Sequence, residues 1–588
     1  MKNVIIIIRL FFLSAVILSN TEQMFPQWIQ TNGPYGGHIS SLAFNGTDIF
    51  AGTQNGIYHS SDNSQIWKFS GLLNTEVRSI AFSGKNIYTG TAIGIFVSTD
   101  KGAKWTAVNK GLTNKNIYSL LVNGKNIYAG TSGGGIFLSV NNNRVWTPVN
   151  TGLTNTVIRS LASEGKILFA GTYEGGVFTS YDFGKSWKQN NSALQHKIVF
   201  TIISNGSGLF AGTESGLFSS YDNGISWKQS DSGIINKHIS TIAVNGTDLI
   251  SGTANGIYVS KNNGTDWKPG NENLLINTIT CVGVSNNYIF TGTDGCGIFI
   301  KDKKLKDYTW HESNNGLTNI VVRSFAVSDS GIIAGTDNGI FSTGDDGGNW
   351  SFQGLRESLI GTLAVKGIYK YAGTWNGVYV SGENDTTWTL TGLKNNNARA
   401  LIVKGTYLFS GTQVGVYITS DNGVKWKYSD KGFTDTYITS FALKSPDILA
   451  GTGSGLFISI NNGLSWSYLG LANKPVSTVC FNGNSIIAGT FKDGIYVSDD
   501  DGKSWIHPVS DKITIQSIIN YGEFIVAASL GNGIYISNNN GVSWKQINNG
   551  LAELNVVSLV FDDKYLFAGT YGMGVWKYPI EKLLSLDK

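Results

Sequence analysis

The chain has 588 residues, more than one ordinary hydrophobic core can organise, so we expect more than one domain. Glycine is abundant at 74 residues and proline scarce at 8, which is typical of many short strands joined by tight turns. The formal net charge is only +4, and no dense cluster of Lys and Arg occurs, which argues against a nucleic-acid-binding protein.

Residues 1–22 predict a secretory signal peptide, because Lys2 precedes an apolar run that polar residues close. An N-terminal membrane anchor is the alternative, but the uninterrupted run from Leu10 to Leu18 is short for a span. No later segment is long and apolar enough to cross a bilayer. We therefore expect a secreted mature chain without a membrane span, either periplasmic or extracellular.

A repeat of about 40 residues follows the leader. Of the 16 tryptophans, fourteen lie 38 to 43 residues apart: Trp28, Trp67, Trp105, Trp146, Trp187, Trp227, Trp267, Trp310, Trp350, Trp388, Trp426, Trp466, Trp505 and Trp544. Each unit alternates polar and apolar residues between Gly- and Asn-containing turns, which predicts four short antiparallel strands. Units of this size stack radially into β-propellers of about 4–8 blades. The sequence therefore predicts an all-β fold of two tandem seven-bladed propellers.

The turn that precedes the repeated tryptophan marks the ends of the rings. Twelve units have an acid turn such as STDKGAKW, whereas the seventh (GCGIFIKDKKLKDYTW) and the fourteenth (GMGVWKYPIEKLLSLDK) lack it. We predict a first propeller over residues 23–305 and a second over residues 306–588. We also expect a leading strand to close each ring. The Trp28 strand would lie beside the blade ending near Ile300, and the Trp310 strand beside the blade ending near Tyr578.

One acidic or amide side chain stands five residues before the tryptophan in twelve units. The positions are Asp62, Asp100, Asn141, Asp182, Asp222, Asn262, Asp345, Glu383, Asp421, Asn461, Asp500 and Asn539. A general acid or base must ionise, and Asn cannot, so the four Asn argue against catalysis here. Asp and Asn oxygens both accept hydrogen bonds from nearby backbone N–H groups, so we expect a structural role. A calcium site would need several carboxylates at each turn, and most turns offer one.

The pattern S/T-x-D-x-G-x-x-W resembles the Asp-box, or BNR repeat, over nearly the whole chain after the leader. Sialidases, sortilin-type receptors, photosystem II assembly factors and two-propeller xyloglucanases share it, and the seven-plus-seven layout most resembles the xyloglucanases. That resemblance implies a catalytic Asp in the first blade of each ring. Asp337 (AGTDNGIF) matches one position, but Gln54 (AGTQNGIY) stands at the other. Asp294 lies in a similar turn of a different blade.

Glycoside hydrolysis ordinarily needs two carboxylates, so we expect no catalytic residue. Asp337 is the candidate only if the chain is a hydrolase, and the alternative for it is a solvated turn residue. The three cysteines, Cys281, Cys296 and Cys480, form neither a disulfide framework nor a zinc-ligand spacing. We expect neither a metal nor a cofactor.

Ligand contacts are expected on the face that carries the links into the innermost strands. Arg78, Arg159, Arg323 and Arg399 occupy one equivalent position at the start of these strands. They could hold an anionic group at the mouth of the central channel, or they could be solvated or bridge blades. Trp375 and Tyr173 share a turn position from which an aromatic ring could stack on a sugar or anchor a partner, or pack over a neighbouring loop.

We expect a non-enzymatic scaffold that binds a protein or a polysaccharide through its loop faces or the cleft between the propellers. One alternative is a glycoside hydrolase acting on β-glucan or xyloglucan-type polysaccharide. It requires a second carboxylate about 5–10 Å from Asp337. Another alternative is an assembly factor for a membrane complex, since the photosystem assembly factors, which this chain resembles, use a basic propeller face for partner binding.

Overall fold

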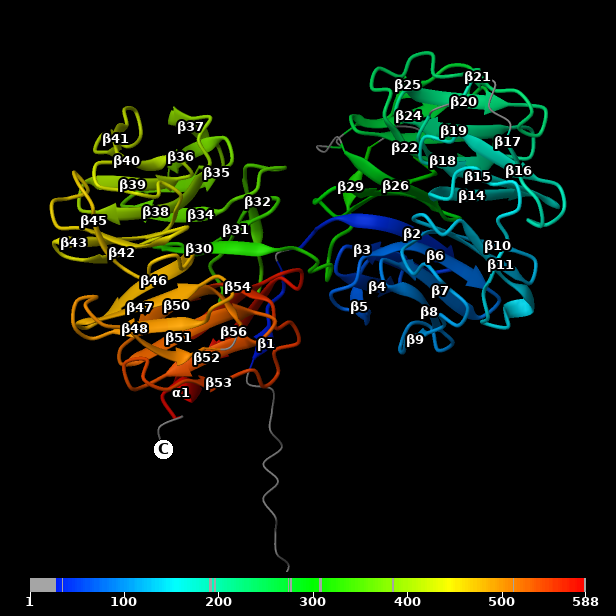
Figure 1. The fold of residues 1–588 in the computed structure, drawn as a ribbon. Helices are drawn as coiled ribbons and strands as arrows, with labels where there is room; N and C mark the ends of the chain where they lie inside the picture. The colour runs from blue at the N-terminus through cyan, green and yellow to red at the C-terminus, as the bar shows by residue number, and fades with distance from the viewer. Residues whose placement is uncertain are drawn as a thin grey trace, which may run out of the picture.

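The computed structural model describes residues 28–33, 35–189, 193–194, 197–272, 274, 278–305, 309–382, 385–510 and 512–585. The predicted signal peptide and Glu383 lie outside these ranges. Within them, fourteen four-stranded antiparallel sheets form two rings of seven, which confirms the fold of two seven-bladed propellers (Figure 1). Outside the sheets lie the 3-10 turn η1 (Val140–Asn142) and the helix α1 (Ile580–Leu583). No helix of the described residues is long and apolar enough to span a membrane.

In the first ring every blade consists of four consecutive strands, starting from the innermost. Blade by blade, they are β2 (Ile39–Asn45), β3 (Asp48–Thr53), β4 (Gly56–Ser60), β5 (Lys68–Gly71); β6 (Val77–Ser83), β7 (Asn86–Thr91), β8 (Gly94–Ser98), β9 (Thr106–Ala107); β10 (Ile117–Asn123), β11 (Asn126–Thr131), β12 (Ile136–Ser139), β13 (Thr147–Pro148); β14 (Ile158–Glu164), β15 (Ile167–Thr172), β16 (Val177–Ser180), β17 (Lys188–Gln189); β18 (Val199–Ser204), β19 (Leu209–Thr213), β20 (Gly216–Ser220), β21 (Lys228–Gln229); β22 (Ile239–Asn245), β23 (Asp248–Thr253), β24 (Gly256–Ser260), β25 (Lys268–Pro269); β26 (Ile279–Val284), β27 (Tyr288–Thr293), β28 (Ile298–Asp302) and β29 (His311–Glu312).

The second ring repeats this plan in six blades, and its seventh blade takes its outer strand from the start of the chain. Its strands are β30 (Val322–Ser328), β31 (Gly331–Thr336), β32 (Gly339–Thr343), β33 (Ser351–Gly354); β34 (Thr362–Lys366), β35 (Tyr369–Thr374), β36 (Gly377–Gly382), β37 (Thr389–Lys394); β38 (Ala398–Lys404), β39 (Tyr407–Thr412), β40 (Gly415–Thr419), β41 (Lys427–Ser429); β42 (Ile438–Lys444), β43 (Asp447–Thr452), β44 (Gly455–Ser459), β45 (Ser467–Gly470); β46 (Val476–Asn482), β47 (Ser485–Thr490), β48 (Ile495–Ser498), β49 (Ile506–Val509); β50 (Thr514–Tyr521), β51 (Phe524–Leu530), β52 (Gly533–Ser537), β53 (Lys545–Gln546); β54 (Val556–Phe561), β55 (Tyr565–Thr570), β56 (Val575–Pro579) and β1 (Ile29–Gln30).

The second strand of each blade lies between two neighbouring blades and is buried on both faces. In β7, NIYTGT, every residue after Asn86 is buried. Its glycine is required by the close approach of the next blade, because a Cβ on Gly90 would lie 2.6 Å from Cγ2 of Ile117. The repeated Gly-Thr of the sequence therefore records how tightly the blades stack.

The repeated tryptophan packs against the preceding blade. Trp146 lies in a hydrophobic cluster with Tyr88 and Val97 of the second blade and Phe137 of the third. Its indole N–H donates a hydrogen bond of 2.7 Å to the carbonyl of Val108, which follows β9. Replacing such a buried Trp with Ala typically costs about 3–5 kcal/mol.

The acid turns join the third and fourth strands of a blade through a small hydrogen-bond network. Asp100 Oδ1 accepts hydrogen bonds from the Ser98 hydroxyl (2.8 Å) and the Lys104 N–H (2.9 Å), while Ser98 Oγ accepts one from the Gly102 N–H (2.7 Å). Asn461 makes the equivalent contacts with Ser459 and Ser465. In the third blade Asn143, rather than the expected Asn141, accepts the hydroxyl hydrogen bond of Ser139. These networks need only an acceptor oxygen, from which we infer a structural role for the turn carboxylates.

The predicted closure of the rings is wrong. The strand that follows Trp28, β1, pairs with β56, with Gln30 opposite Trp576, and not with the blade near Ile300. The strand that follows Trp310, β29, pairs with β28 of its own blade, with His311 opposite Ile300. Pairing β28 with β29 closes a short local loop, which costs less chain entropy than recruiting a strand from about 270 residues away.

The tryptophans at the two seams agree with this closure. The indole N–H of Trp67 donates to the carbonyl of Ser313, just after β29, at 2.8 Å. The indole N–H of Trp350 lies 3.3 Å from Oγ1 of Thr31, just after β1. The chain therefore begins in the second ring, builds the whole first ring, and returns to complete the second (Figure 1). The predicted boundary between residues 305 and 306 falls between β28 and β29 of one blade.

Candidate functional site

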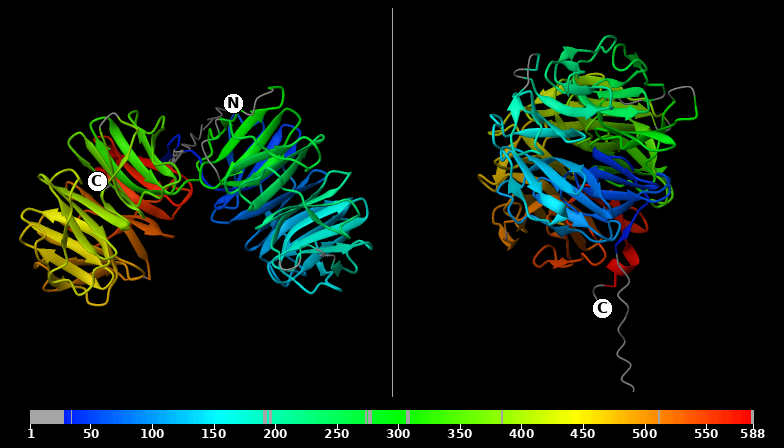
Figure 2. Two further views of the ribbon diagram at one scale, coloured as in Figure 1. Left: turned by 90° about the horizontal axis from the view of Figure 1, so that it is seen from above. Right: turned by 90° about the vertical axis from the view of Figure 1, so that its right-hand side faces the viewer.

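A cavity of about 370 Å³ lies where the two rings meet (the inter-ring cavity). The first blade of each ring and the seventh blade of each ring supply its walls, and Figure 2 shows the two rings meeting at an angle along this boundary. The lining residues are His38, Gln54, Asn55, Thr278, Asp294, Gly295, Asn319, Val321, Asp337, Asn338, Glu357, Tyr571 and Gly572. Most of these side chains are polar, so the cavity suits a ligand with many hydroxyl groups.

The lining is arranged as matched pairs from the two rings. Gln54 and Asp337 each follow the last residue of the second strand in a first blade, and Asp294 and Tyr571 do the same in the seventh blades. The amides that come next, Asn55 and Asn338, form a third pair. Each ring therefore presents two equivalent turns to the other. The side chains differ between the rings in the first two pairs and are the same amide in the third.

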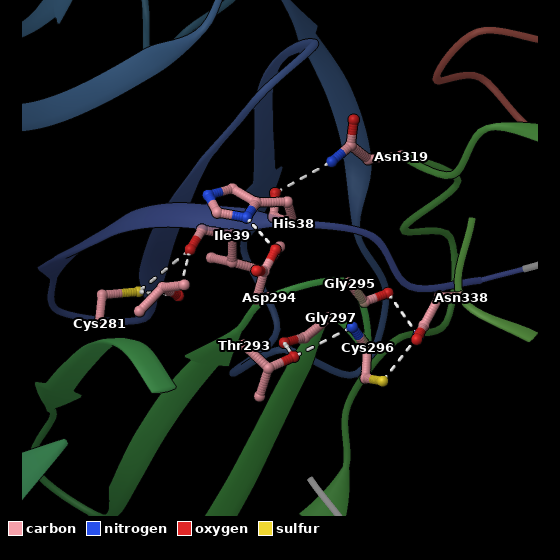
Figure 3. Close-up of polar contacts among 11 residues, drawn as sticks. His38, Ile39, Cys281, Thr293, Asp294, Gly295, Cys296, Gly297, Asn319 and Asn338 are labelled. Carbon is pink, nitrogen blue, oxygen red and sulfur yellow. Dashed lines mark hydrogen bonds and ion pairs between the residues drawn. The ribbon is translucent and has the colours of Figure 1, made fainter. Parts of the chain in front are cut away.

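The paired amides hold the rings together. Asn338 Nδ2 donates to the carbonyl of Gly295 at 2.8 Å and also contacts Sγ of Cys296 (Figure 3). Its Oδ1 accepts the N–H of Glu357. Asn55 Nδ2 donates to the carbonyl of Tyr571 at 3.1 Å. Because both amides are buried and both cross the boundary, they fix the separation of the walls.

Two of the three carboxyl groups of the cavity, those of Asp294 and Asp337, lie in opposite environments. Asp294 Oδ1 lies 2.6 Å from Nδ1 of His38, and this hydrogen bond lowers the pKa of Asp294 (Figure 3). Burial raises the pKa of Asp337, against the opposing charge of Arg323, and the charge of Asp294 raises it further. The Oδ1 atom of Asp337 is buried and has no hydrogen-bond partner among the described residues. The two environments therefore shift the pKa values of Asp337 and Asp294 in opposite directions.

Sequence reasoning set Asp294 aside because it lies in a different blade from the expected one. Closing the first ring places the seventh blade beside the first, so the turn of Asp294 faces the same cavity as Asp337 and Gln54. His38, which pairs with Asp294, was also missed, since nothing in its local sequence distinguishes it from the other scattered histidines.

The structure places the remaining predicted ligand-binding residues at three different locations. Arg323, Arg399 and Trp375 line one cavity of about 610 Å³ at the channel mouth of the second ring. Arg78 and Arg159 in the first ring each lie over the ring of Tyr118, at 4.8 and 4.7 Å, so they bridge blades. Tyr173 is exposed, and its carbonyl accepts a hydrogen bond from Asn155.

No group of three or more His, Cys, Asp or Glu residues that could hold a metal occurs in the described part of the chain. The three cysteines are buried and unpaired. Burial raises the pKa of the Cys281 and Cys480 thiols to about 12, so neither is a nucleophile at neutral pH.

Solved structures with this architecture include enzymes and a surface protein. A protein described as an ancestral GH74 enzyme matches at a TM-score of 0.75 and 16% identity, over 94% of this chain and 99% of that chain. The GH74 xyloglucanase of Xanthomonas campestris matches at 0.70 and 14%, with the same coverage. PorZ of Porphyromonas gingivalis, a surface component of the type IX secretion system, matches at 0.61 and 16%, over 94% and 87%. No protein-family profile and no curated protein sequence matches the chain. At these identities the chain shares with its neighbours the fold of two tandem seven-bladed propellers.

Proposed function

We propose that this chain is a secreted glycan-binding protein that holds a polysaccharide segment in the inter-ring cavity. One observation carries the proposal: the buried Oδ1 of Asp337 has no partner among the described residues, in a cavity whose other lining side chains are mostly polar. An unsatisfied buried acceptor is costly, and a sugar hydroxyl that enters the cavity would supply the missing donor. Secretion rests on the leader pattern of residues 1–22.

Tyr571 extends the cavity outward, because its side chain is half-exposed at the rim. An aromatic ring at the entrance of a polar cavity offers a flat apolar face to one side of a sugar while the amides reach its hydroxyls. Gln54, opposite, is an exposed amide on the wall of the first ring.

Calorimetric titration with xyloglucan and mixed-linkage β-glucan oligosaccharides tests the proposal. We expect binding by the wild-type chain and binding weakened about tenfold or more in Tyr571→Ala and Gln54→Ala. Tyr173→Ala is the matched control, because Tyr173 occupies the same turn position in a blade remote from the cavity. Binding that survives both cavity variants, or that fails for every neutral glycan, would contradict the site.

Glycoside hydrolysis is the second candidate, and the opposite pKa shifts of Asp337 and Asp294 favour it. A carboxyl that keeps its proton can act as the general acid, and one that stays ionised can act as nucleophile or base. Both residues face one cavity, so Asp294 is the candidate for the second carboxylate that the sequence lacked at Gln54.

Release of reducing ends from xyloglucan separates the two candidates. A hydrolase should lose activity about 10³-fold or more in both Asp337→Asn and Asp294→Asn. The control is Asp345→Asn, which alters an exposed acid turn of the same ring. If the wild-type chain binds the glycan and releases nothing, the non-enzymatic proposal stands and the hydrolase is excluded for that substrate.

A further inference from the structure

The central channel differs between the two rings at one repeated position. This position follows the first buried residue of each innermost strand, and in blades two to five of the first ring it holds Arg78, Tyr118, Arg159 and Phe200. Arg159 lies over Tyr118 at 4.7 Å and over Phe200 at 5.5 Å, so cations and aromatic rings alternate. Arg78 lies over Tyr118 from the other side and pairs with Glu76. The first ring thus fills its own channel mouth.

In the second ring several blades carry small side chains at the same position. Blades two, four and five carry the small residues Gly361, Thr439 and Ser477, and Arg399 remains in blade three. The result is a cavity of about 610 Å³ to which all seven blades contribute (the channel-mouth cavity). Its lining includes Arg323, Arg399, Tyr437, Gln516, Trp375 and Phe491.

The two arginines of the channel-mouth cavity lack the polar partners that Arg78 has in the first ring, where it pairs with Glu76 and Asn116. The Nε atoms of Arg323 and Arg399 are both buried, and neither has a hydrogen-bond partner in the described residues. Neither guanidinium forms an ion pair within that part of the chain. Asp337 interacts with Arg323 through its charge, but no ion pair or hydrogen bond joins the two side chains among the described residues. Buried donors on a permanent cation are expensive to leave unpaired, so the cavity is built to receive an anion.

The orientation of Arg399 suits a carboxylate. Its guanidinium lies over the ring of Tyr437 at 4.7 Å, and a guanidinium held against an aromatic ring can still donate a bidentate pair of hydrogen bonds to a carboxylate. The carboxylate of Asp435 accepts the N–H of Tyr437 at 2.9 Å and forms no ion pair with Arg399 among the described residues.

The rim of the cavity indicates what carries the carboxylate. Trp375 is 63% exposed and Phe491 is 48% exposed, at equivalent turns of blades two and five. Amide and hydroxyl groups of Asn397, Gln516 and Thr439 lie in the same lining. Flat aromatic faces with neutral hydrogen-bonding groups suit a sugar ring, and the arginines add a requirement for one negative charge.

We propose that the channel-mouth cavity of the second ring binds an acidic sugar, with its carboxylate on Arg399 and Arg323 and its ring against Trp375. The site is distinct from the inter-ring cavity, so it can fail without affecting glycan binding there. The ligand class is a uronate, either free or as a unit of an acidic polysaccharide. A peptide with a free C-terminal carboxylate is the competing ligand that the experiment must separate.

The test is calorimetric titration of the full chain with glucuronate, its methyl ester and polygalacturonate. We expect glucuronate and polygalacturonate to bind, and the uncharged ester to bind at least about tenfold more weakly. Arg399→Gln should weaken glucuronate binding about 10- to 100-fold, as expected for loss of charge-assisted hydrogen bonds. Arg159→Gln is the matched control, because it removes the charge at the same position in the first ring, and binding should not change.

A second variant fills the cavity without removing an arginine. A Cβ on Gly361 would lie 3.8 Å from its nearest neighbour, the carbonyl oxygen of Ala398, so Gly361→Phe can project into the cavity as side chains do in the first ring. We expect it to abolish glucuronate binding while leaving binding of neutral glycans unchanged. Equal affinity for the ester, an equal loss in Arg159→Gln, full binding by Gly361→Phe, or tighter binding of an acetylated tripeptide with a free C-terminus would each overturn the proposal.

Discussion

Replacing Trp28 with Ala tests whether the first strand of the chain closes the second ring. The Trp28 side chain is 1% exposed, and its ring lies 5.2 Å from that of Tyr578. Its indole N–H donates to the carbonyl of Ile547 in the sixth blade. Loss of a buried Trp costs about 3–5 kcal/mol, a large part of the roughly 5–15 kcal/mol that stabilises a typical domain. We therefore expect the second ring to loosen or unfold while the first stays folded.

Hydrogen exchange followed by mass spectrometry can assign the loss to one ring. Trp28→Ala should speed exchange in β56 and in β30, which contacts β54 and β55 of the same blade across the seam. Trp310→Ala is the matched control, because Trp310 is also buried and precedes β29 in the seventh blade of the first ring. Its indole N–H donates at 2.8 Å to the carbonyl of Gly270 in the sixth blade. Trp310→Ala should speed exchange in β28 and leave β56 protected.

The reverse pattern would refute the reasoning. If Trp28→Ala speeds exchange in Ile298–Asp302 and leaves Val575–Pro579 protected, the first strand belongs to the blade near Ile300. If neither segment changes and the protein unfolds as the wild type does, β1 does not contribute to closing either ring.

Three further predictions follow from single contacts and from pKa shifts. Asn338→Ala removes a hydrogen bond to Gly295 across the inter-ring boundary and one to Glu357 within the second ring, so it should cost about 1–3 kcal/mol. It should also broaden the range of inter-ring angles that fits the small-angle scattering, whereas Asn376→Ala, at the same turn position one blade away, should do neither. Hydrogen bonds in the acid turns lower the pKa of Asp62, Asp100, Asp182, Asp222, Asp345, Asp421 and Asp500, to about 2 for Asp222, Asp345 and Asp500. Their contribution to stability is present above the unfolded pKa of about 4 and is lost as pH falls through the folded values, so urea midpoints at pH 5, 3 and 2 should fall in that order, and a flat series would contradict the turn network. The effect of Asp337 on stability runs the other way with pH, because burial raises its folded pKa. Wild-type stability therefore declines as pH rises from about 4 through the folded pKa. Asp337→Asn should be more stable than wild type at pH 8, and the difference should vanish near pH 4.

The blades were predictable because everything that specifies one lies within about 40 residues. Alternation in segments such as VRSIAFS, the glycine of NIYTGT and the tryptophan that follows the acid turn are local signals, and each has a local cause in the structure. The number of blades follows from counting them. The closure was not predictable in this way, because the choice between β28 and β56 as partner of β1 depends on strands far apart in sequence.

The candidate site shows the same division. The turn of Asp337 was identified from its own sequence, but its environment comes from Arg323 of the neighbouring strand and from Asp294 of the other ring. Asn55 and Asn338 appear in the sequence as ordinary hairpin asparagines, and only the second ring makes them bridges. The four arginines shared one sequence position, yet the structure separates them, because Tyr118 and Phe200 occupy the first ring and Gly361 and Ser477 leave the second open.

Hydrogen bonds connect β1, the strand that closes the second ring, to the wall of the inter-ring cavity. Gln30 of β1 donates hydrogen bonds to the carbonyl of Met573 at 3.0 Å and to Oγ1 of Thr318 at 3.2 Å. Met573 follows Gly572 of the cavity wall, and Thr318 precedes Asn319, which donates to the carbonyl of His38 at 3.1 Å. A ligand that binds the cavity more tightly when β1 is docked must by linkage also stabilise the docked form of β1. Saturating glycan should therefore slow exchange in β56 as well as in the cavity walls, which ties the function of the boundary to the closure of the second ring.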